Sequence, residues 1–339
     1  MRWPWIVLLL SSNVLTAIVI LSMKSSVFNS SSPQRSSSAS DNMLTRQLLH
    51  HPSAEKMSHT IEKFSEPILR PLSTIRTTKS QIIFAITPTY VRDTQKVDLT
   101  SLCQTIMHVQ NLLWLVVEDS DMKTALVSDV LDRCKVESVQ LNVYTPPGKK
   151  SISSGVDQRN LGLGWIRRYC SNQTNCTGSV YFMDDDNKYD LRLFEEIKKT
   201  QQVSVFLVGF CGGMRAEGPI CNRNGRAKLW NAKWQPKRSL PIDMAGFAVR
   251  VELIVAKPNA LIGVDKFGKQ SKLGYLESDF LGNFVNRDMV ECRGNNREVL
   301  VWHVRTQKPR IRYLPNLKRE DNLQKEDKSS APNEGEGRA

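Results

Sequence analysis

The fold is decided by one stretch, SVYFMDDDNKYDLRLFEEI at residues 179–197. Its first five residues, 179–183, form an apolar run typical of a buried β-strand, and three aspartates follow directly. Asp190 then precedes apolar residues at helical spacing, where its carboxylate can cap the first turn of a helix. A strand, an acidic loop and a helix in this order predict one unit of an alternating α/β fold.

The same alternation is found upstream of this stretch. We expect strands at 81–87, 112–117 and about 139–144, and helices at about 99–109 and 121–134. Pro88 is expected to end the first strand, because proline cannot donate to a sheet ladder. The order predicts a mostly parallel sheet with crossover helices, whose ligand site lies at the carboxyl ends of the strands.

Acidic residues follow two of these strands, with Glu118 and Asp119 after the second and Asp184 to Asp186 after the run at 179–183. Carboxylates in such a loop can hold Mg²⁺ or Mn²⁺, which in turn binds a diphosphate, because hard cations prefer oxygen ligands. A solvated acidic turn and a calcium loop are the alternatives.

Composition limits the function classes. The chain has 339 residues, a formal net charge of +13, 40 % hydrophobic residues and seven cysteines. A collagen-like, coiled-coil or wholly disordered chain is excluded, and the absence of a CxxC pair argues against structural zinc. Residues 81–307 carry no dense basic run, so we expect a pocket for a phosphorylated small molecule and no nucleic acid partner.

The N-terminus is typical of a membrane anchor. Residues 3–23 carry no charge, which is long enough for a transmembrane helix, and no small-x-small cleavage site follows. Loop charge does not decide the orientation. A serine-rich stem at 24–79 and a charged tail at 316–339, expected to be disordered, flank the foldable body.

Two further features indicate a secretory lumen. Glycosylation sequons begin at Asn29, Asn172 and Asn175. Cys170 and Cys176 bracket a polar hexapeptide loop and can form a small disulfide, with buried free thiols as the alternative.

Eight ordered blocks identify a family. The chain resembles the β-1,3-glucuronyltransferases of the Golgi from about residue 82 to 307, in the blocks ITPTY, VVED, DQRNLGLGWIR, YFMDDDNKYDLRLFEEI, VGFCGG, PIDMAGFAV, LESDFL and VWHVRT. The resemblance implies a manganese-dependent, inverting enzyme of GT-A type that moves glucuronic acid from UDP-glucuronic acid to a terminal galactose. It also implies a UDP-sugar-binding half at 80–186 and an acceptor-binding and catalytic half at 187–315.

The resemblance implies donor contacts as well. Asp186 would be the direct Mn²⁺ ligand, with Asp184 and Asp185 on the ribose and the sugar, and the uridine, ribose and diphosphate contacts would be Pro88, Thr89, Tyr90, Asp119, Arg159, His303 and Arg305. Arginine suits the diphosphate and sugar carboxylate because its planar fork donates several hydrogen bonds. The family often has a second arginine where this chain has Ser154, so that donor contact is either missing or supplied from elsewhere, for example by Lys149 or Lys150.

Glu277 matches the catalytic base of the family, which takes the proton of the acceptor hydroxyl. Without the family, Glu277 and Asp279 can equally favour the dipole of a predicted helix start. The implied acceptor contacts are Glu217, Trp234, Arg238 and Asp243. Trp234 can stack on a galactose face, with an ordinary core tryptophan as the alternative.

Three functions compete at this point. The first is transfer to the Gal-Gal-Xyl linker of proteoglycans, the second is the same transfer to N-acetyllactosamine ends of N-glycans or glycolipids, and the third is a non-catalytic luminal lectin. An intact Asp triplet and Glu277 argue against the lectin. We expect a homodimer and a single-pass type II protein of the Golgi membrane with a luminal body.

Overall fold

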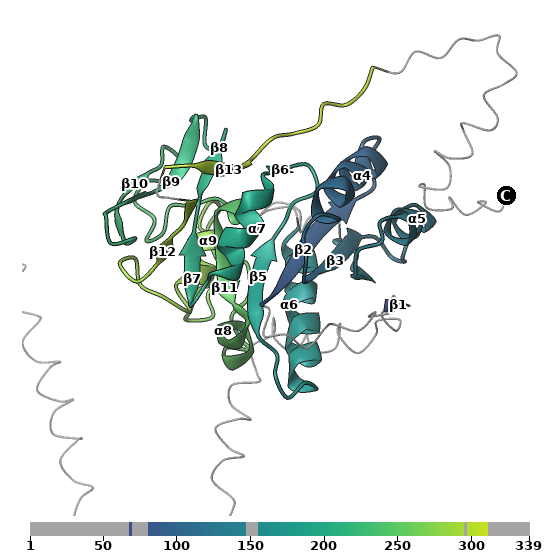
Figure 1. Ribbon diagram of the computed structural model, residues 1–339, viewed down its shortest axis with the longest axis horizontal. Helices are drawn as coiled ribbons and strands as arrows, with labels where there is room; N and C mark the ends of the chain where they lie inside the picture. The colour runs from purple at the N-terminus through teal and green to yellow at the C-terminus, as the bar shows by residue number, and fades with distance from the viewer. Residues whose placement is uncertain (1–67, 70–80, 147–154, 295–296, 311–339) are drawn as a thin grey trace, which may run out of the picture. The chain divides into compact units, whose positions relative to one another are not determined.

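The computed structural model describes residues 68–69, 81–146, 155–294 and 297–310 (Figure 1). The chain divides into two compact units, Met1–Lys63 and Phe64–Ala339, and all described residues belong to the second. The predicted membrane span, almost all of the stem, the tail, Asn29 and Ser154 with its neighbouring lysines lie outside the described residues. Among the helices of the described part, none is both long and apolar enough to cross a bilayer.

Helices and strands alternate through the first half of the described chain. The helices are α4 (Gln95–Ile106), α5 (Ala125–Arg133), α6 (Val156–Ser171), α7 (Leu191–Lys198), α8 (Val251–Ala256) and α9 (Leu276–Leu281), with the 3-10 helix η2 (Met244–Gly246). The strands are β1 (Ile68–Leu69), β2 (Ile82–Tyr90), β3 (Leu112–Asp119), β4 (Ser138–Asn142), β5 (Gly178–Phe182), β6 (Lys188–Tyr189), β7 (Val203–Val205), β8 (Leu207–Gly209), β9 (Ala216–Cys221), β10 (Ala227–Asn231), β11 (Phe247–Arg250), β12 (Glu291–Cys292) and β13 (Val299–Trp302).

The larger sheet has the strand order β1-β4-β3-β2-β5-β11-β7-β12. Its block β4-β3-β2-β5 is parallel, as the sequence predicts. Successive residues of β2 and β3 enter two different cores, one packed with α6 and the other with α4, α5 and α7 (Figure 1). A sheet covered on both faces explains why these strands are apolar throughout.

Beyond β5 the sheet is mixed, because β12 pairs parallel with β7 at its edge whereas β11 does not. Strand β11 pairs antiparallel with both β5 and β7. A second sheet has the order β10-β9-β8-β13-β6, in which only β8 and β13 are parallel. The α/β class is confirmed, but the mostly parallel arrangement holds only for the first block.

Pro88 does not end the first strand, so that expectation is wrong. Strand β2 continues to Tyr90 and pairs with β3 through Pro88. The carbonyl of Ile86 accepts from Met183 on the β5 side, and Pro88, two residues later, faces the same side. Because β5 ends at Phe182, the missing N–H of Pro88 costs no ladder hydrogen bond.

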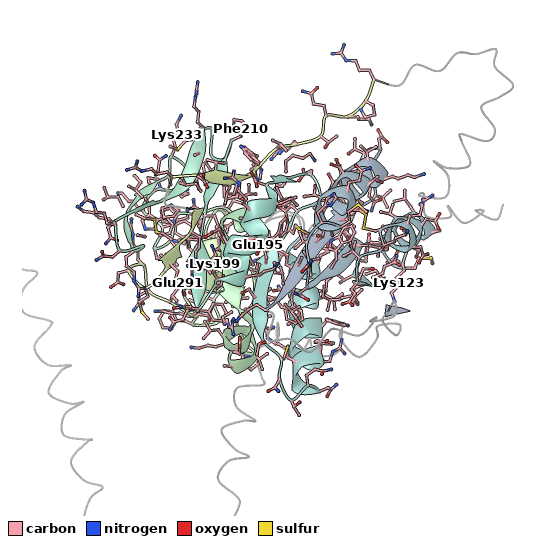
Figure 2. The ribbon with its side chains drawn as sticks, viewed as in Figure 1. Lys123, Glu195, Lys199, Phe210, Lys233 and Glu291 are labelled. Atoms are coloured by element: carbon pink, nitrogen blue, oxygen red, sulfur yellow. A yellow bond between two sulfur atoms is a disulfide. The ribbon has the colours of Figure 1, made fainter. Side chains whose placement is uncertain are left out.

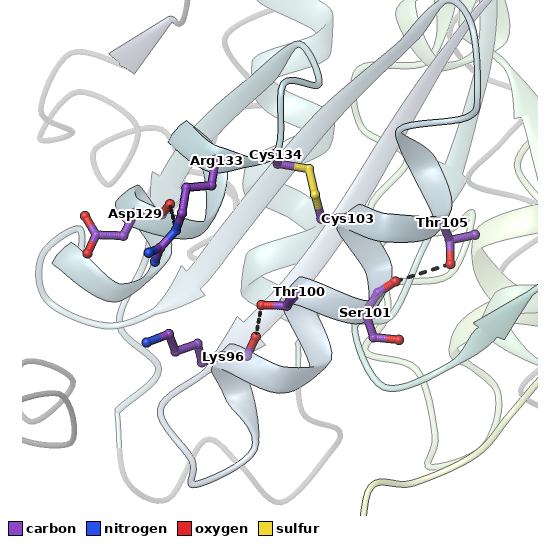
Figure 3. The surroundings of a disulfide bond; sticks show 8 residues. All are labelled: Lys96, Thr100, Ser101, Cys103, Thr105, Asp129, Arg133 and Cys134. Carbon is purple, nitrogen blue, oxygen red and sulfur yellow. Dashed lines mark hydrogen bonds between the residues drawn. A yellow bond between two sulfur atoms is a disulfide. The ribbon is translucent and has the colours of Figure 1, made fainter. Parts of the chain in front are cut away.

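Three disulfides link residues in the described part of the chain. Cys170–Cys176 forms as one of the two expected alternatives, and Cys103–Cys134 and Cys221–Cys292 are additional. Cys103–Cys134 joins α4 to the end of α5 (Figure 3). Cys211 is the free cysteine among the described residues. Asn172 and Asn175 are exposed beside the Cys170–Cys176 loop.

Candidate functional site

The three aspartates after β5 have different surroundings. Asp185 is buried, and its two carboxylate oxygens are already bonded, one to the Thr89 hydroxyl at 2.7 Å and one to Arg92 at 2.8 Å. Burial raises its pKa to about 6, although Arg92 and Thr89 oppose the shift. Arg92 also donates to Asp98 on α4. Asp185 therefore fastens the acidic loop to the β2–α4 connection.

Asp184 is fastened from another direction. Its Oδ1 accepts from the Arg159 guanidinium at 2.5 Å, and its backbone carbonyl accepts from the Tyr189 hydroxyl at 2.7 Å. Arg159 lies in the first turn of α6, after Gly155. Gly155 has a φ of 81°, and a Cβ there would lie 2.6 Å from the Arg159 guanidinium. Glycine is required here so that the arginine can reach the loop.

Asp186 lacks such a partner. Among the described residues no basic side chain lies within ion-pair distance of its carboxylate. Burial, and then the neighbouring Asp184, raise the pKa of Asp186, while Arg92 and His303 oppose the shift. A bound cation stabilises the ionised form of a carboxylate that is partly buried beside a second acid. Carboxylate oxygens are ligands that suit Mg²⁺ or Mn²⁺. The residues present therefore fit a divalent ion.

A second group of charges is buried around Arg238. Its guanidinium lies 3.1 Å from Glu217 and 3.7 Å from Glu277, and it also donates to the backbone carbonyls of Trp234, Gln235, Ile242 and Gly274. Glu217 and Arg238 are almost completely buried. Arg238 thereby joins β9, the segment before η2 and the loop before α9.

Glu277 is the most perturbed carboxyl of this group. It lies in the first turn of α9. Burial and then the charge of Asp243 raise its pKa to about 7, against the opposing charges of Arg238 and Arg159. A pKa near neutrality suits a general base, and the influence of Arg159 ties Glu277 to the acidic loop. A helix-start role alone does not explain this shift.

Asp243 lies between the two groups. Its Oδ1 accepts from the Ala245 amide and so caps η2, and its Oδ2 lies 3.3 Å from both His303 Nδ1 and Cys211 Sγ. Burial would raise the pKa of Asp243, but His303 and these hydrogen bonds together hold it low. The Asp243 carboxylate in turn raises the pKa of His303, as do Asp184 and Asp186. The negative charges of Asp243, Asp184 and Asp186 therefore favour the protonated form of His303.

The other candidate residues lie at the edge of these groups, where Tyr90 contacts Arg92 with its ring 4.7 Å from the guanidinium. Asp119 accepts from the Thr145 amide at 2.7 Å, and Tyr90 and Arg305 are exposed. Trp234 is 53 % exposed, so it is not a core tryptophan. Its indole packs against Gly274, where a Cβ would lie 2.6 Å from Nε1. Pro88 lies in β2 without a side-chain contact that joins it to the charged groups.

Sequence reasoning missed one residue that holds the acidic loop and one residue that lies beside the site without a part in transfer. Arg92 links Asp185 to Asp98, and Cys211 links the loop after β8 to Asp243. Arg92 lies two residues after the quoted block ITPTY, so its position beside that block was a usable signal. Cys211 lies inside the quoted block VGFCGG but gave no signal, since its partners come from distant segments.

Comparisons with known proteins identify the family of the chain. The model of glycosyltransferase family 43 matches residues 102–307. The chain is 42 % identical over 239 residues to galactosylgalactosylxylosylprotein 3-beta-glucuronosyltransferase sqv-8 of Caenorhabditis elegans, covering 68 % of this chain and 65 % of that protein. It is 40 % identical to galactosylgalactosylxylosylprotein 3-beta-glucuronosyltransferase 2 of Rattus norvegicus, over 74 % of this chain and 75 % of that protein. It is 41 % identical to galactosylgalactosylxylosylprotein 3-beta-glucuronosyltransferase 1 of Homo sapiens, over 67 % of this chain and 70 % of that protein.

Proposed function

The chain belongs to glycosyltransferase family 43, and we propose that it is a β-1,3-glucuronosyltransferase. The reaction would transfer glucuronic acid from UDP-glucuronic acid to the 3-position of a terminal galactose, with inversion of configuration at the anomeric carbon. Relatives at about 40 % identity carry this activity in their names. The observation that carries the proposal is Glu277, a partly buried carboxyl with a pKa raised to about 7 beside Arg238.

The donor half, residues 80–186, would hold the UDP-sugar at the carboxyl ends of β2, β3 and β5, in a GT-A type arrangement. Thr89, Tyr90, Pro88 and Asp119 would surround the uridine and ribose. Arg159 and the cation His303 would lie against the diphosphate, with Arg305 as a further basic group. Positive charges in place before the reaction stabilise the negative charge that develops on departing UDP.

Glu277 would take the proton from the acceptor hydroxyl as that oxygen attacks the anomeric carbon. Its side chain is held within 3.7 Å of Arg238, which limits its rotation. The acceptor half, residues 187–315, would use Glu217, Arg238 and Asp243 around this base, with exposed Trp234 as a stacking surface.

We further propose that Asp186 binds Mn²⁺, with Asp184 beside it. The bound cation would supply neutralisation of the diphosphate as UDP leaves. Asp185 would contribute by holding the loop in place through Thr89 and Arg92.

The preferred acceptor is the Gal-Gal-Xyl linker of proteoglycans, because the named relatives act on galactosylgalactosylxylosylprotein. The natural setting would be a Golgi membrane homodimer with an anchor at 1–23, a stem at 24–79 and a luminal body. Exposed Asn172 and Asn175, and the three disulfides, support a secretory lumen.

The test is a transfer assay with the full-length protein. UDP-glucuronic acid is offered with a Gal-Gal-Xyl glycoside, with N-acetyllactosamine and with no acceptor, with Mn²⁺ or with excess chelator. We expect transfer to the linker, loss of activity in chelator, and loss of both metal dependence and UDP affinity in Asp186→Ala. Preference for N-acetyllactosamine would reassign the acceptor, and glycan binding without transfer would support the lectin.

Topology has its own measurement. In intact vesicles the body should resist added protease, and after detergent has opened the vesicles, glycosidase should remove glycans from Asn172 or Asn175. A body that is cut in intact vesicles would rule out the type II orientation.

A further inference from the structure

We propose that Cys211, Asp243 and His303 form an inhibitory site for Zn²⁺ or a similar thiophilic cation. The site is separate from the one proposed for Mn²⁺ at Asp186. The inhibitory part of this inference rests on the proposed transferase function, whereas the binding part does not.

The three side chains converge from three separate segments. Cys211 follows β8, Asp243 precedes η2, and His303 follows β13. The backbone amide of His303 donates to the Gly209 carbonyl at 2.9 Å, which brings the end of β13 next to the loop that carries Cys211. Phe210, at the exposed start of this loop (Figure 2), has a φ of 59° and turns the chain so that Cys211 faces inward.

The ligand atoms are spaced as a metal site requires. Cys211 Sγ and His303 Nδ1 each lie 3.3 Å from Asp243 Oδ2, and all three atoms lie within 4.8 Å of one another. Tetrahedral Zn²⁺ with bonds of about 2.0–2.3 Å separates its ligand atoms by roughly 3.3–3.8 Å. Small side-chain rotations would therefore suffice. Three protein ligands leave a fourth position for water.

His303 Nδ1 supplies an independent observation. The atom is buried, and its 3.3 Å contact with Asp243 Oδ2 is an ion pair that lacks the geometry of a hydrogen bond among the described residues. A buried ring nitrogen without a hydrogen-bond partner is the kind of polar atom that calls for an explanation, and a bound cation provides one.

The donor set distinguishes this site from the acidic loop. One sulfur, one imidazole nitrogen and one carboxylate favour Zn²⁺, whereas Mn²⁺ prefers oxygen ligands. Burial, and then the negative charges of Asp243, Glu217 and Glu277, raise the pKa of the Cys211 thiol, so the thiol keeps its proton until a cation replaces it. These charges would attract a divalent cation. The thiol proton, which Cys211 now donates to Asp243, would leave to solvent as the sulfur binds the ion.

Occupancy would inhibit transfer because it removes two groups from their proposed tasks. His303 would be held as a neutral ligand and lose the positive charge that faces the diphosphate. Asp243 would be drawn from the environment of Glu277. Cys211 has no task in the proposed transfer, so its conservative replacement should leave basal activity intact.

Binding is tested first, by titrating the full-length, disulfide-bonded protein with Co²⁺ as a spectroscopic substitute for Zn²⁺. We expect a thiolate-to-cobalt charge-transfer band, displaced by Zn²⁺, that is absent from Cys211→Ser. His108→Ala, which removes an exposed histidine, is the matched control and should keep the band. A wild-type protein without the band overturns the proposal, and histidines elsewhere in the chain cannot produce the band without a thiolate.

Inhibition is tested next, with saturating Mn²⁺ and UDP-glucuronic acid. The Zn²⁺ concentration for half-inhibition should rise by roughly tenfold or more in Cys211→Ser and in Cys211→Val, at unchanged basal turnover. Equal inhibition of wild type and both variants would mean that Zn²⁺ acts elsewhere, and would overturn the proposal of inhibition at this site. A cobalt band in a protein without any transferase activity would instead refute the proposed function and leave the metal site standing.

Discussion

Carboxylates on the two sides of the site are used differently. In the acidic loop after β5, Asp184 and Asp185 each have an arginine partner within 2.8 Å. On the other side, Glu217 and Glu277 share the single guanidinium of Arg238, and Glu277 is the more distant at 3.7 Å. Both carboxylate oxygens of Asp185 have partners and hold structure, although burial raises its pKa to about 6, whereas the partly buried and weakly paired Glu277 has a pKa raised to about 7 and can exchange a proton.

The largest effect should come from Glu277→Gln. The amide keeps the volume but cannot accept a proton, so turnover should fall by roughly 10²- to 10⁴-fold. Single-turnover transfer at saturating donor, together with calorimetric UDP affinity in Mn²⁺, measures the two quantities separately. UDP affinity should hardly change.

Amide variants of Glu217, Asp243 and Asp279 are the comparison set for this experiment. Only Glu277→Gln should lose transfer with intact donor binding. Near-normal turnover in Glu277→Gln would move the base to one of the other three acids, and weak UDP binding or an unfolded protein would make Glu277 a structural residue.

Arg238→Met should show how much the shared guanidinium stabilises the acceptor side. Glu217 and Glu277 would be left buried without a cation, which costs about 3–5 kcal/mol of unfolding free energy. Denaturant unfolding measures the change. Arg192→Met is the matched control, since Arg192 pairs with Asp190 and Glu298 at the surface and should alter stability little. Equal effects in both variants would contradict the difference between buried and exposed pairs.

The disulfides offer a smaller test. Cys221–Cys292 links the second sheet to the edge of the first across 71 residues, whereas Cys170–Cys176 closes a local loop of separation 6. In the chain-entropy account, removing the longer link should destabilise the protein by about 2 kcal/mol more. Paired Cys→Ser variants of each bridge, compared by thermal unfolding, measure the difference. The same loss in both would mean that the links act through native contacts.

The smallest expected effect is the dependence of turnover on pH, which follows from the raised pKa of Glu277. Because Glu277 must be deprotonated to act as a base, turnover should rise with pH around a midpoint near 7, and be roughly tenfold lower at pH 6 than at pH 8. Asp243→Asn removes a charge that raises the pKa of Glu277, so the midpoint should move to lower pH. A midpoint that stays in place would argue that another group titrates.

Local patterns in the sequence determined the first half of the fold. The apolar runs at β2, β3 and β5 and the cap residue Asp190 each act within a few residues, so periodicity and capping chemistry were sufficient to predict them. The strand through Pro88 was not predictable, because tolerance of proline depends on where the neighbouring strand β5 ends.

The sequence by itself also identified the family and nominated the site residues, because the ordered blocks preserve residue types at set distances along the chain. Only the tertiary structure decided which of those residues touch. Examples are the contact of Asp185 with Arg92, the sharing of Arg238 by Glu217 and Glu277, and the meeting of Cys211 with Asp243 and His303. These contacts join residues that are far apart in the sequence, as does the hydrogen bond between Thr89 and Asp185, which are separated by 96 residues. Burial and charge at such contacts set each pKa, and neither can be read from neighbouring letters in a sequence.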